Sequence, residues 1–236
     1  AITGNTYVWS PSVGLSNAAI AQPIANTTDT YTLTVTKTSN GCTSTDAVTV
    51  AIDTTRPIAN AGVDKIITCT NPTQVIGTAA TTGNSYAWTP SVGLSNTAIA
   101  QPTANTAANY ILTVTKNANG CTSSDAVLVT ADTTRPGANA GSDVTLTCIN
   151  STLQIGSVSV AGNTYAWSPA LGLSNASIAQ PAANSNGIYT LTVTKLVNGC
   201  TSTDAVTVAV DTTKPTANAG ADKIITCTNP TLQIGT

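Results

Sequence analysis

The sequence contains no histidine, glutamate, phenylalanine or methionine, and only 8% of its residues are charged. Without histidine, a serine nucleophile lacks its usual general base, and the ten acidic residues, all aspartate, are too few to suggest a catalytic carboxylate pair. The net charge of -2 provides no basic footprint for nucleic acid. No apolar stretch approaches the roughly 20 residues of a membrane span. These absences argue against an enzyme, a nucleic-acid-binding protein and a membrane-spanning segment.

The residues that are present favour strands and turns. Hydrophobic residues make up 41% of the chain, and most of them are alanine, valine, isoleucine and leucine. Threonine, serine and asparagine dominate the remainder, a mixture that suits strands and tight turns better than helices. Any core must therefore be small and rich in β-branched side chains.

An uninterrupted internal repeat of about 79 residues runs through the chain. Three tryptophans and two sets of three cysteines recur at this spacing: Trp9, Trp88 and Trp167; Cys42, Cys121 and Cys200; Cys69, Cys148 and Cys227. No insertion or deletion breaks the register, so each period is expected to fold in the same way.

A polar run that ends in proline, Asp53–Pro57, recurs at 132–136 and 211–215 and is typical of a linker. These linkers predict complete domains over 57–132 and 136–211, the C-terminal part of a repeat over 1–53 and the N-terminal part of a further repeat over 215–236. Two explanations fit the partial repeats. We favour a longer array of which this is one segment; the other is completion by neighbouring chains through strand donation.

Within the second period the pattern predicts about seven short strands separated by turn signals, including 64–69, 73–80, 85–88, 98–104, 110–115 and 121–132. This spacing predicts an all-β fold, made of tandem immunoglobulin-like β-sandwich repeats. The tryptophan on the third strand and the tyrosine that opens the penultimate strand occupy core positions in that fold. The predicted core aromatics are Trp9, Trp88, Trp167, Tyr31, Tyr110 and Tyr189.

Two cysteines per period indicate disulfides and an oxidising compartment, but the sequence leaves two pairings open. One pairing closes each domain internally, as Cys69–Cys121 and Cys148–Cys200. However, Cys69 ends the first predicted strand and Cys121 begins the last, which places them roughly 20–30 Å apart at opposite ends of a sandwich. A disulfide needs Cα atoms within about 7 Å. The alternative, towards which this geometry leans, joins consecutive domains through Cys69–Cys200, with Cys42, Cys121, Cys148 and Cys227 pairing outside the segment.

Calcium is the one metal for which the sequence offers candidate ligands. Asp53, Asn60 and Asp64 fall around the linker, and calcium binds six to eight oxygen ligands. Three candidates without glutamate make a weak signal, and turn formation by Asx side chains is the alternative. No other metal or cofactor is expected, because the cysteines are not clustered for zinc.

Five motifs carry a resemblance to a known family: Tyr-x-Trp-Ser/Thr-Pro-x-x-Gly-Leu-Ser-Asn (86–96), Ile-Ala-Gln-Pro (99–102), Tyr-x-Leu-Thr-Val-Thr (110–115), Asn-Gly-Cys-Thr-Ser (119–123) and Ala-Asn-Ala-Gly (138–141). With these motifs the whole chain resembles the PKD-like, Ig-like repeats of giant cell-surface adhesins in Bacteroidetes. That family includes gliding-motility adhesins exported by the type IX system. The Gly-Asp-Gly that usually follows the tryptophan in PKD domains is replaced here by Ser-Pro-x-x-Gly-Leu-Ser.

The resemblance implies a long extracellular filament on a bacterial cell surface, used for attachment, gliding motility or matrix. It also implies O-glycosylation at Asp-Thr-Thr motifs, with Thr54, Thr133 and Thr212 as candidate acceptors. The expected partners are neighbouring repeats of the same chain or of like chains, and surface glycans. The alternatives are a repeat module that itself binds a glycan or host surface, and a self-assembling subunit in which 1–53 and 215–236 complete one domain between chains.

Overall fold

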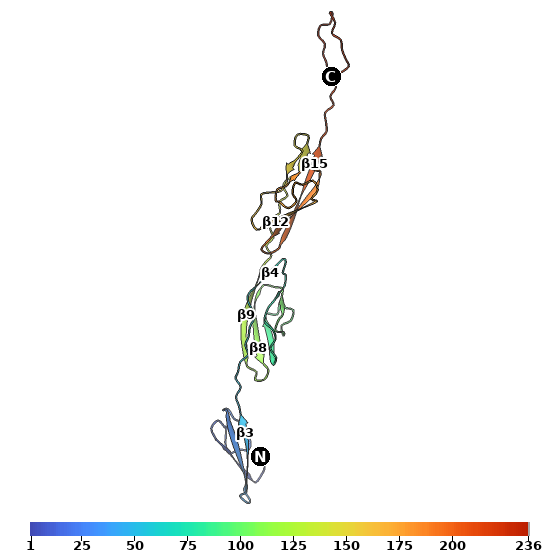
Figure 1. Ribbon diagram of the computed structural model, residues 1–236. Coiled ribbons are helices and arrows are strands. Elements are labelled where there is room, and N and C mark those ends of the chain that lie inside the picture. Colours follow the sequence, from blue (N-terminus) through green and yellow to red (C-terminus); the bar gives the residue numbers. More distant parts are fainter. Residues whose placement is uncertain (236) are drawn as a thin grey trace. The chain divides into compact units, whose positions relative to one another are not determined.

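The computed structural model describes residues 1–235, in which every regular element is a β-strand (Figure 1). The first repeat contributes β1 (Asn5–Ser10), β2 (Asp29–Lys37) and β3 (Thr43–Val50). The second contributes β4 (Lys65–Thr68), β5 (Gln74–Val75), β6 (Asn84–Thr89), β7 (Thr103–Ala104), β8 (Ala108–Lys116) and β9 (Thr122–Asp132). The third contributes β10 (Val144–Thr147), β11 (Leu153–Gln154), β12 (Asn163–Ser168), β13 (Ala182–Ala183), β14 (Gly187–Lys195) and β15 (Thr201–Asp211).

The second and third repeats share one sheet topology. A four-stranded sheet in the order β4-β9-β8-β6 accompanies the two-stranded sheet β5-β7, and the third repeat repeats this with β10-β15-β14-β12 and β11-β13. The first strand of each repeat runs parallel to the last, and Thr68 pairs with Asp132 at the end of that ladder. The residue after Thr68 is Cys69, so the parallel pairing brings this cysteine to the start of the linker.

The cores form on one face of the two longest strands of each repeat. Buried and exposed residues alternate along β8 and β9, as the two-residue period of a strand requires. The buried members are at most 2% exposed: Tyr110, Leu112, Val114, Val127 and Val129, with Tyr189, Leu191, Val193, Val206 and Val208 in the third repeat. The all-β, immunoglobulin-like sandwich that the sequence predicts is confirmed.

Two core aromatics of the second repeat tie a long loop to the sheet. Trp88 is 2% exposed, and its indole Nε1 donates a hydrogen bond of 2.9 Å to the carbonyl of Ile99. The hydroxyl of Tyr110 donates one of 3.0 Å to the carbonyl of Val92, and burial raises the pKa of this hydroxyl. The loop over 90–102 is therefore held at two points.

Two predicted strands are much shorter than expected, and the second repeat has six strands instead of about seven. The predicted strand over 73–80 is reduced to β5, because Gly77 adopts a φ of +81° and packs against the carbonyl of Ala100. A side chain at Gly77 would overlap that carbonyl. The predicted strand over 98–104 is reduced to β7, since Pro102 has no N–H to donate to a ladder.

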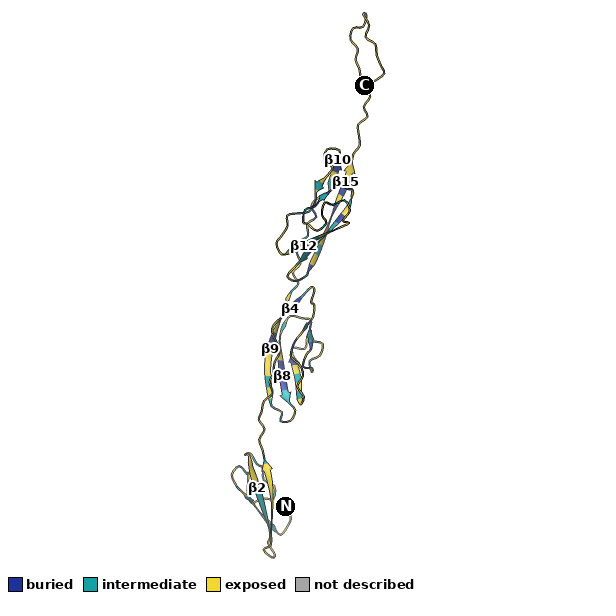
Figure 2. Ribbon diagram, in the orientation of Figure 1, coloured by how far each residue is buried: buried dark blue, intermediate teal, exposed yellow. Residues whose placement is uncertain are grey.

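The first repeat forms only the sheet β1-β2-β3 among the described residues, and its core is open on one side. Val48 on β3 is 48% exposed, against 1% for its counterparts Val127 and Val206. Trp9 is half-buried, unlike Trp88, so the prediction that it is a core residue holds only in part. In Figure 2 the first repeat is mostly teal and yellow, because no described segment covers this face.

The chain divides into two compact units that do not coincide with the repeats. The first comprises Ala1–Asp64, Val75–Ala104 and Ala108–Leu128, and the second comprises Lys65–Gln74, Asn105–Ala107 and Val129–Thr236. Each junction between consecutive repeats thus lies inside one unit: the first junction in the first unit, the second in the second.

Candidate functional site at the repeat junctions

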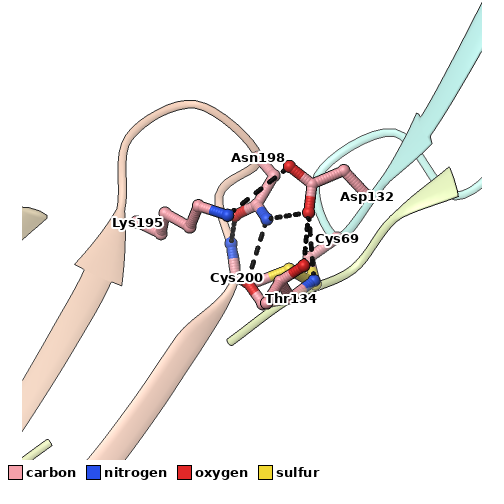
Figure 3. Close-up of polar contacts among 6 residues, drawn as sticks. All are labelled: Cys69, Asp132, Thr134, Lys195, Asn198 and Cys200. Atoms are coloured by element: carbon pink, nitrogen blue, oxygen red, sulfur yellow. Dashed lines mark hydrogen bonds and ion pairs between the residues drawn. A yellow bond between two sulfur atoms is a disulfide. The ribbon is translucent and has the colours of Figure 1, made fainter. Parts of the chain in front are cut away.

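A disulfide joins the second repeat to the third. Cys69, directly after β4, bonds to Cys200, directly before β15, with their Cα atoms 5.0 Å apart (Figure 3). Of the two pairings that the sequence left open, the structure therefore has the one between consecutive repeats. The amide of Cys69 also donates a 3.1 Å hydrogen bond to the carbonyl of Asn198. Cys200 is fully buried by these contacts.

A tight turn presents Cys200 to the junction. The amide of Gly199 donates to the carbonyl of Lys195 at 2.8 Å. Gly199 has a φ of +67°, a conformation that glycine adopts without strain. The side chain of Asn198 accepts the amide of Cys200 at 3.0 Å and so holds the cysteine at the end of the turn. An added Cβ at Gly199 would overlap Thr70, which shows how closely the two repeats approach here.

Asp132 organises the polar side of the same junction (Figure 3). Its carboxylate accepts hydrogen bonds from the hydroxyl of Thr134 at 2.8 Å and from the amide nitrogen of the Asn198 side chain at 2.9 Å. These bonds, together with the nearby ammonium of Lys195, lower the pKa of Asp132 to about 2. Asn198 also donates to the carbonyl of Thr134 at 2.9 Å, and it is 1% exposed. One buried asparagine therefore bridges the linker and the turn.

The first junction, within the first unit, has the equivalent polar contacts. Lys116 Nζ lies 2.9 Å from Asp53, and the hydrogen bonds from Lys116 and Thr55 hold the pKa of Asp53 well below its usual range. Asn119, the counterpart of Asn198, donates to the carbonyl of Thr55 at 3.0 Å. The ion pairs at both junctions are partly exposed, so they orient the linker more than they stabilise it.

Arginines of the linkers add a further contact at each junction. Arg56 donates to the carbonyl of Thr122 at 3.4 Å, and Arg135 donates to that of Thr201 at 3.1 Å. The sequence did not predict these bonds or those of the asparagines, because the polar run over 53–57 indicated a linker without any contacts to the next repeat. A lysine followed three positions later by an asparagine recurs at the spacing of the repeat, at 37 and 40, 116 and 119, and 195 and 198. This recurrence is the sequence signal that indicates these contacts.

The first junction has no disulfide among the described residues. Cys121, the counterpart of Cys200, is a half-buried free thiol, and Cys42, Cys148 and Cys227 are exposed free thiols. The polar network thus recurs at both junctions, whereas among the described residues the disulfide is present at the second junction alone.

The calcium candidates are engaged separately. The side chain of Asn60 accepts the amide of Gly62, and that of Asp64 accepts the amide of Leu128, while Asp53 serves the first junction. In residues 1–235 no three or more His, Cys, Asp or Glu side chains gather as metal ligands. Calcium binding stays a prediction that the structure does not test. Over the same residues, no helix is long and apolar enough to cross a membrane.

The three candidate glycosylation sites, Thr54, Thr133 and Thr212, lie exposed in the linkers. The second is flanked by Asp132 and Thr134, whose side chains bond to each other, so the linker backbone is held while the intervening threonine remains accessible. This position is compatible with a bulky modification.

The sheet topology defines the class of protein: a tandem array of immunoglobulin-like all-β repeats. No protein-family model matches the chain, and no curated protein matches it. Among solved structures it is similar to extracellular domains 3–5 of Drosophila OTK, at 13% identity and a TM-score of 0.37, covering 88% of this chain and 86% of that one. It is also similar to EC1–3 of mouse PcdhgC3, at 9% identity and a TM-score of 0.36, covering 88% and 89%. The three N-terminal domains of the bacteriophage RB49 outer capsid protein Hoc match at 11% identity and a TM-score of 0.35, covering 89% of each chain. Similarities of this size identify no ligand or partner.

Proposed function

We propose that the chain is a non-enzymatic, structural repeat segment of an extracellular bacterial surface filament or adhesin stalk. The observation that carries the proposal is the Cys69–Cys200 disulfide, which joins consecutive repeats instead of closing one. Disulfides persist in oxidising compartments outside the cytosol. A bond placed between repeats strengthens the connection between them, which is what a filament under tension requires. The resemblance to PKD-like adhesin repeats supports the bacterial surface.

The disulfide also changes the path that a pulling force takes through the chain. Tension applied to the two ends passes directly from Cys69 to Cys200, so that the intervening residues are shielded from it. The two cysteines are 131 positions apart in the sequence. At about 3.5 Å per extended residue, the disulfide withholds roughly 450 Å of extension. A stalk built in this way keeps its length even when a sandwich unfolds.

Sugars on the linkers fit the same role. A glycan on Thr54, Thr133 or Thr212 would stand beside a junction and shield the linker from proteases. Surface glycans of neighbouring cells or of matrix are the proposed partners, along with like chains in the filament. Glycopeptide mapping of the native protein tests this: unmodified linker peptides throughout would exclude O-glycosylation.

The surface role is tested by immunogold electron microscopy on the bacterium that carries the gene, with antibodies raised against one complete repeat. Gold along filaments outside the cell is the expected result, and a deletion strain should lose label together with attachment or gliding. Label confined to the cytoplasm, or a deletion strain that attaches and glides normally, would contradict the proposal.

A further inference from the structure

A surface groove lies at the start of the third repeat, between the linker and two turns. Its volume is about 690 Å³, and its lining comes from the linker over 135–137, the turn over 160–163 and the turn over 195–197. The second repeat has a groove of about 380 Å³ at the equivalent segments. Each groove lies within one of the two compact units. A cavity that recurs at the same place is a property of the repeat and not of one loop.

Five lining positions hold the same residue types in both grooves. In the third repeat they are Arg135, Pro136, Gly162, Asn163 and Lys195, and the residues one repeat earlier are of the same five types. Two of the five are cationic, so the two grooves hold four of the chain's eight lysines and arginines. Among the described residues that line either groove, none is an aspartate. The sparse positive charge of this chain is thus concentrated at the grooves.

The arginine is the cation that each groove leaves available for a ligand. Lys195 is paired with Asp132 at 3.5 Å, and the lysine of the second groove is paired in the same way. Arg135 has no ion pair within residues 1–235, and one hydrogen bond of 3.1 Å to the carbonyl of Thr201 holds it in position. A guanidinium has five N–H donors in a planar fork, which matches the two oxygens of a carboxylate. The groove therefore offers a site for one carboxylate.

The groove also contains a polar group that suits hydroxyls. The backbone amide of Asn163 donates to the carbonyl of Val160 at 3.3 Å, whereas its side-chain amide has no hydrogen-bond partner in the part of the chain that the structure describes. A side-chain amide both donates and accepts, as hydroxyl partners require. The preceding Gly162 has nothing within 4 Å of an added Cβ, so the space beside this amide is open.

The walls of the groove are aliphatic in the third repeat and more polar in the second. Val160, Leu196 and Val197 are 59%, 64% and 74% exposed. Exposed apolar side chains that gather around a cavity mark a binding surface. The second repeat has Thr81 and Ala118 in place of the two valines. Because the walls are exposed, the groove is open along its rim and admits one ring of a longer chain.

A carboxylate, several hydroxyls and an apolar C–H face occur together in a uronic acid, a hexose whose sixth carbon is a carboxylate. We propose that the grooves of the second and third repeats each bind one uronic acid ring of an acidic polysaccharide. The carboxylate pairs with the arginine, ring hydroxyls bond to the asparagine amide, and the C–H face packs against the proline and the walls. Volumes of about 380 and 690 Å³ lie within the range of small-molecule pockets.

The two grooves differ in the affinity expected of them. The third should bind a ring more tightly, because its aliphatic walls bury more C–H surface than the threonine and alanine of the second. A polymer that engages both grooves binds more tightly than a single ring. This inference rests on the proposed extracellular function and deepens it, since it names the class of surface glycan that the filament would hold.

The experiment titrates the full chain, with its Cys69–Cys200 disulfide intact, with two polymers of uronic acids, polygalacturonate and alginate. NMR spectra of the ¹⁵N-labelled chain locate the binding, and calorimetry measures the affinity. Amides over 160–163 and 195–197 should shift, as should those over 81–84. The affinity should fall as salt is added, because the charges are partly exposed. The same polymers with their carboxylates reduced to alcohols, and poly-L-aspartate, should each bind at least about tenfold more weakly.

Matched variants isolate the groove of the third repeat, whose affinity is followed through the amides over 160–163. Arg135→Gln removes the partner of the carboxylate and should weaken binding there about tenfold. Lys65→Gln removes the same charge outside both grooves and should change nothing. Val160→Thr combined with Val197→Ala gives the third groove the walls of the second and should weaken binding about fivefold.

Three results would overturn the proposal. The first is that neither polymer shifts the groove amides. The second is that the carboxyl-reduced polymers or poly-L-aspartate bind as tightly, and the third is that Arg135→Gln and Lys65→Gln weaken binding equally, which would show unspecific attraction between charges. These failures leave the surface role standing if immunogold labels the filaments. Uronate binding by a chain that is labelled only in the cytoplasm would instead contradict the surface role alone.

Discussion

Removing the Cys69–Cys200 disulfide is expected to destabilise the third repeat by about 4 kcal/mol. The disulfide restricts the unfolded chain, and its effect grows with the loop that it closes. If both repeats unfolded together the loop would be the full 131 residues, worth about 5 kcal/mol. If the second repeat stays folded, the loop runs from Asp132 to Cys200, roughly 70 residues, which gives the lower figure. A domain of about 75 residues has a total stability of only ~4–11 kcal/mol.

The assay is hydrogen exchange of the β14 amides, followed by mass spectrometry, in the double variant Cys69→Ser, Cys200→Ser. These amides lie in the core and exchange through global opening. A loss of about 4 kcal/mol should accelerate their exchange roughly a thousandfold. The matched control is Cys121→Ser, which removes the equivalent thiol of the second repeat where no disulfide exists, and should change nothing. Acceleration below about tenfold, or an equal effect of the control, would refute the loop-entropy reasoning and assign the junction to its hydrogen bonds.

Three further outcomes are expected from the core aromatics and the second linker. Trp88→Ala should cost about 3–5 kcal/mol of unfolding free energy, whereas Trp9→Ala should cost clearly less because Trp9 is half-buried; denaturant unfolding of each variant measures both. Tyr110→Phe leaves the carbonyl of Val92 without this donor and should cost about 1 kcal/mol in the same assay. The pKa of Asp132 falls from 3.8 to about 2 on folding, so its contribution is complete above about pH 4 and is lost as the pH falls through about 2. Urea midpoints of the third repeat against pH should show this loss, and Asp132→Asn should abolish it.

The sequence predicted the repeat, the sandwich and the core face of the long strands because these depend on period and alternation, which single residues report directly. The lengths of β5 and β7 could not be predicted in the same way. Gly77 looks like an ordinary strand residue until its close approach to Ala100 is known. The half-burial of Trp9 depends on its neighbours in space: its local sequence is similar to that of Trp88, but no described segment covers it.

The junction was predicted in part. Strand direction and a rise of roughly 3.3 Å per residue were enough to argue that Cys69 and Cys121 lie too far apart to bond. The parallel pairing of β4 with β9 causes this separation, because it fixes Cys69 beside Asp132 at the end of β9, whereas Cys121 directly precedes the start of β9. The role of Asn198 could not be deduced, since a buried amide that bridges two repeats has the same sequence signature as an ordinary Asn-Gly turn.

The disulfide spacing has a consequence for a longer array of such repeats. The Cys69–Cys200 loop is longer than one repeat, so Cys121 and Cys148 both lie inside it. If the same bond forms at every junction of the array, each disulfide loop opens before the previous one closes. Tension then runs through short segments such as 121–148, each made of a last strand, its linker and the next first strand. The remaining strands of every sandwich lie off this path, so thermal unfolding of a core lengthens the array very little. Single-molecule stretching of the native filament should show extensions limited to these segments, and full-length release of whole repeats would contradict the overlapping arrangement.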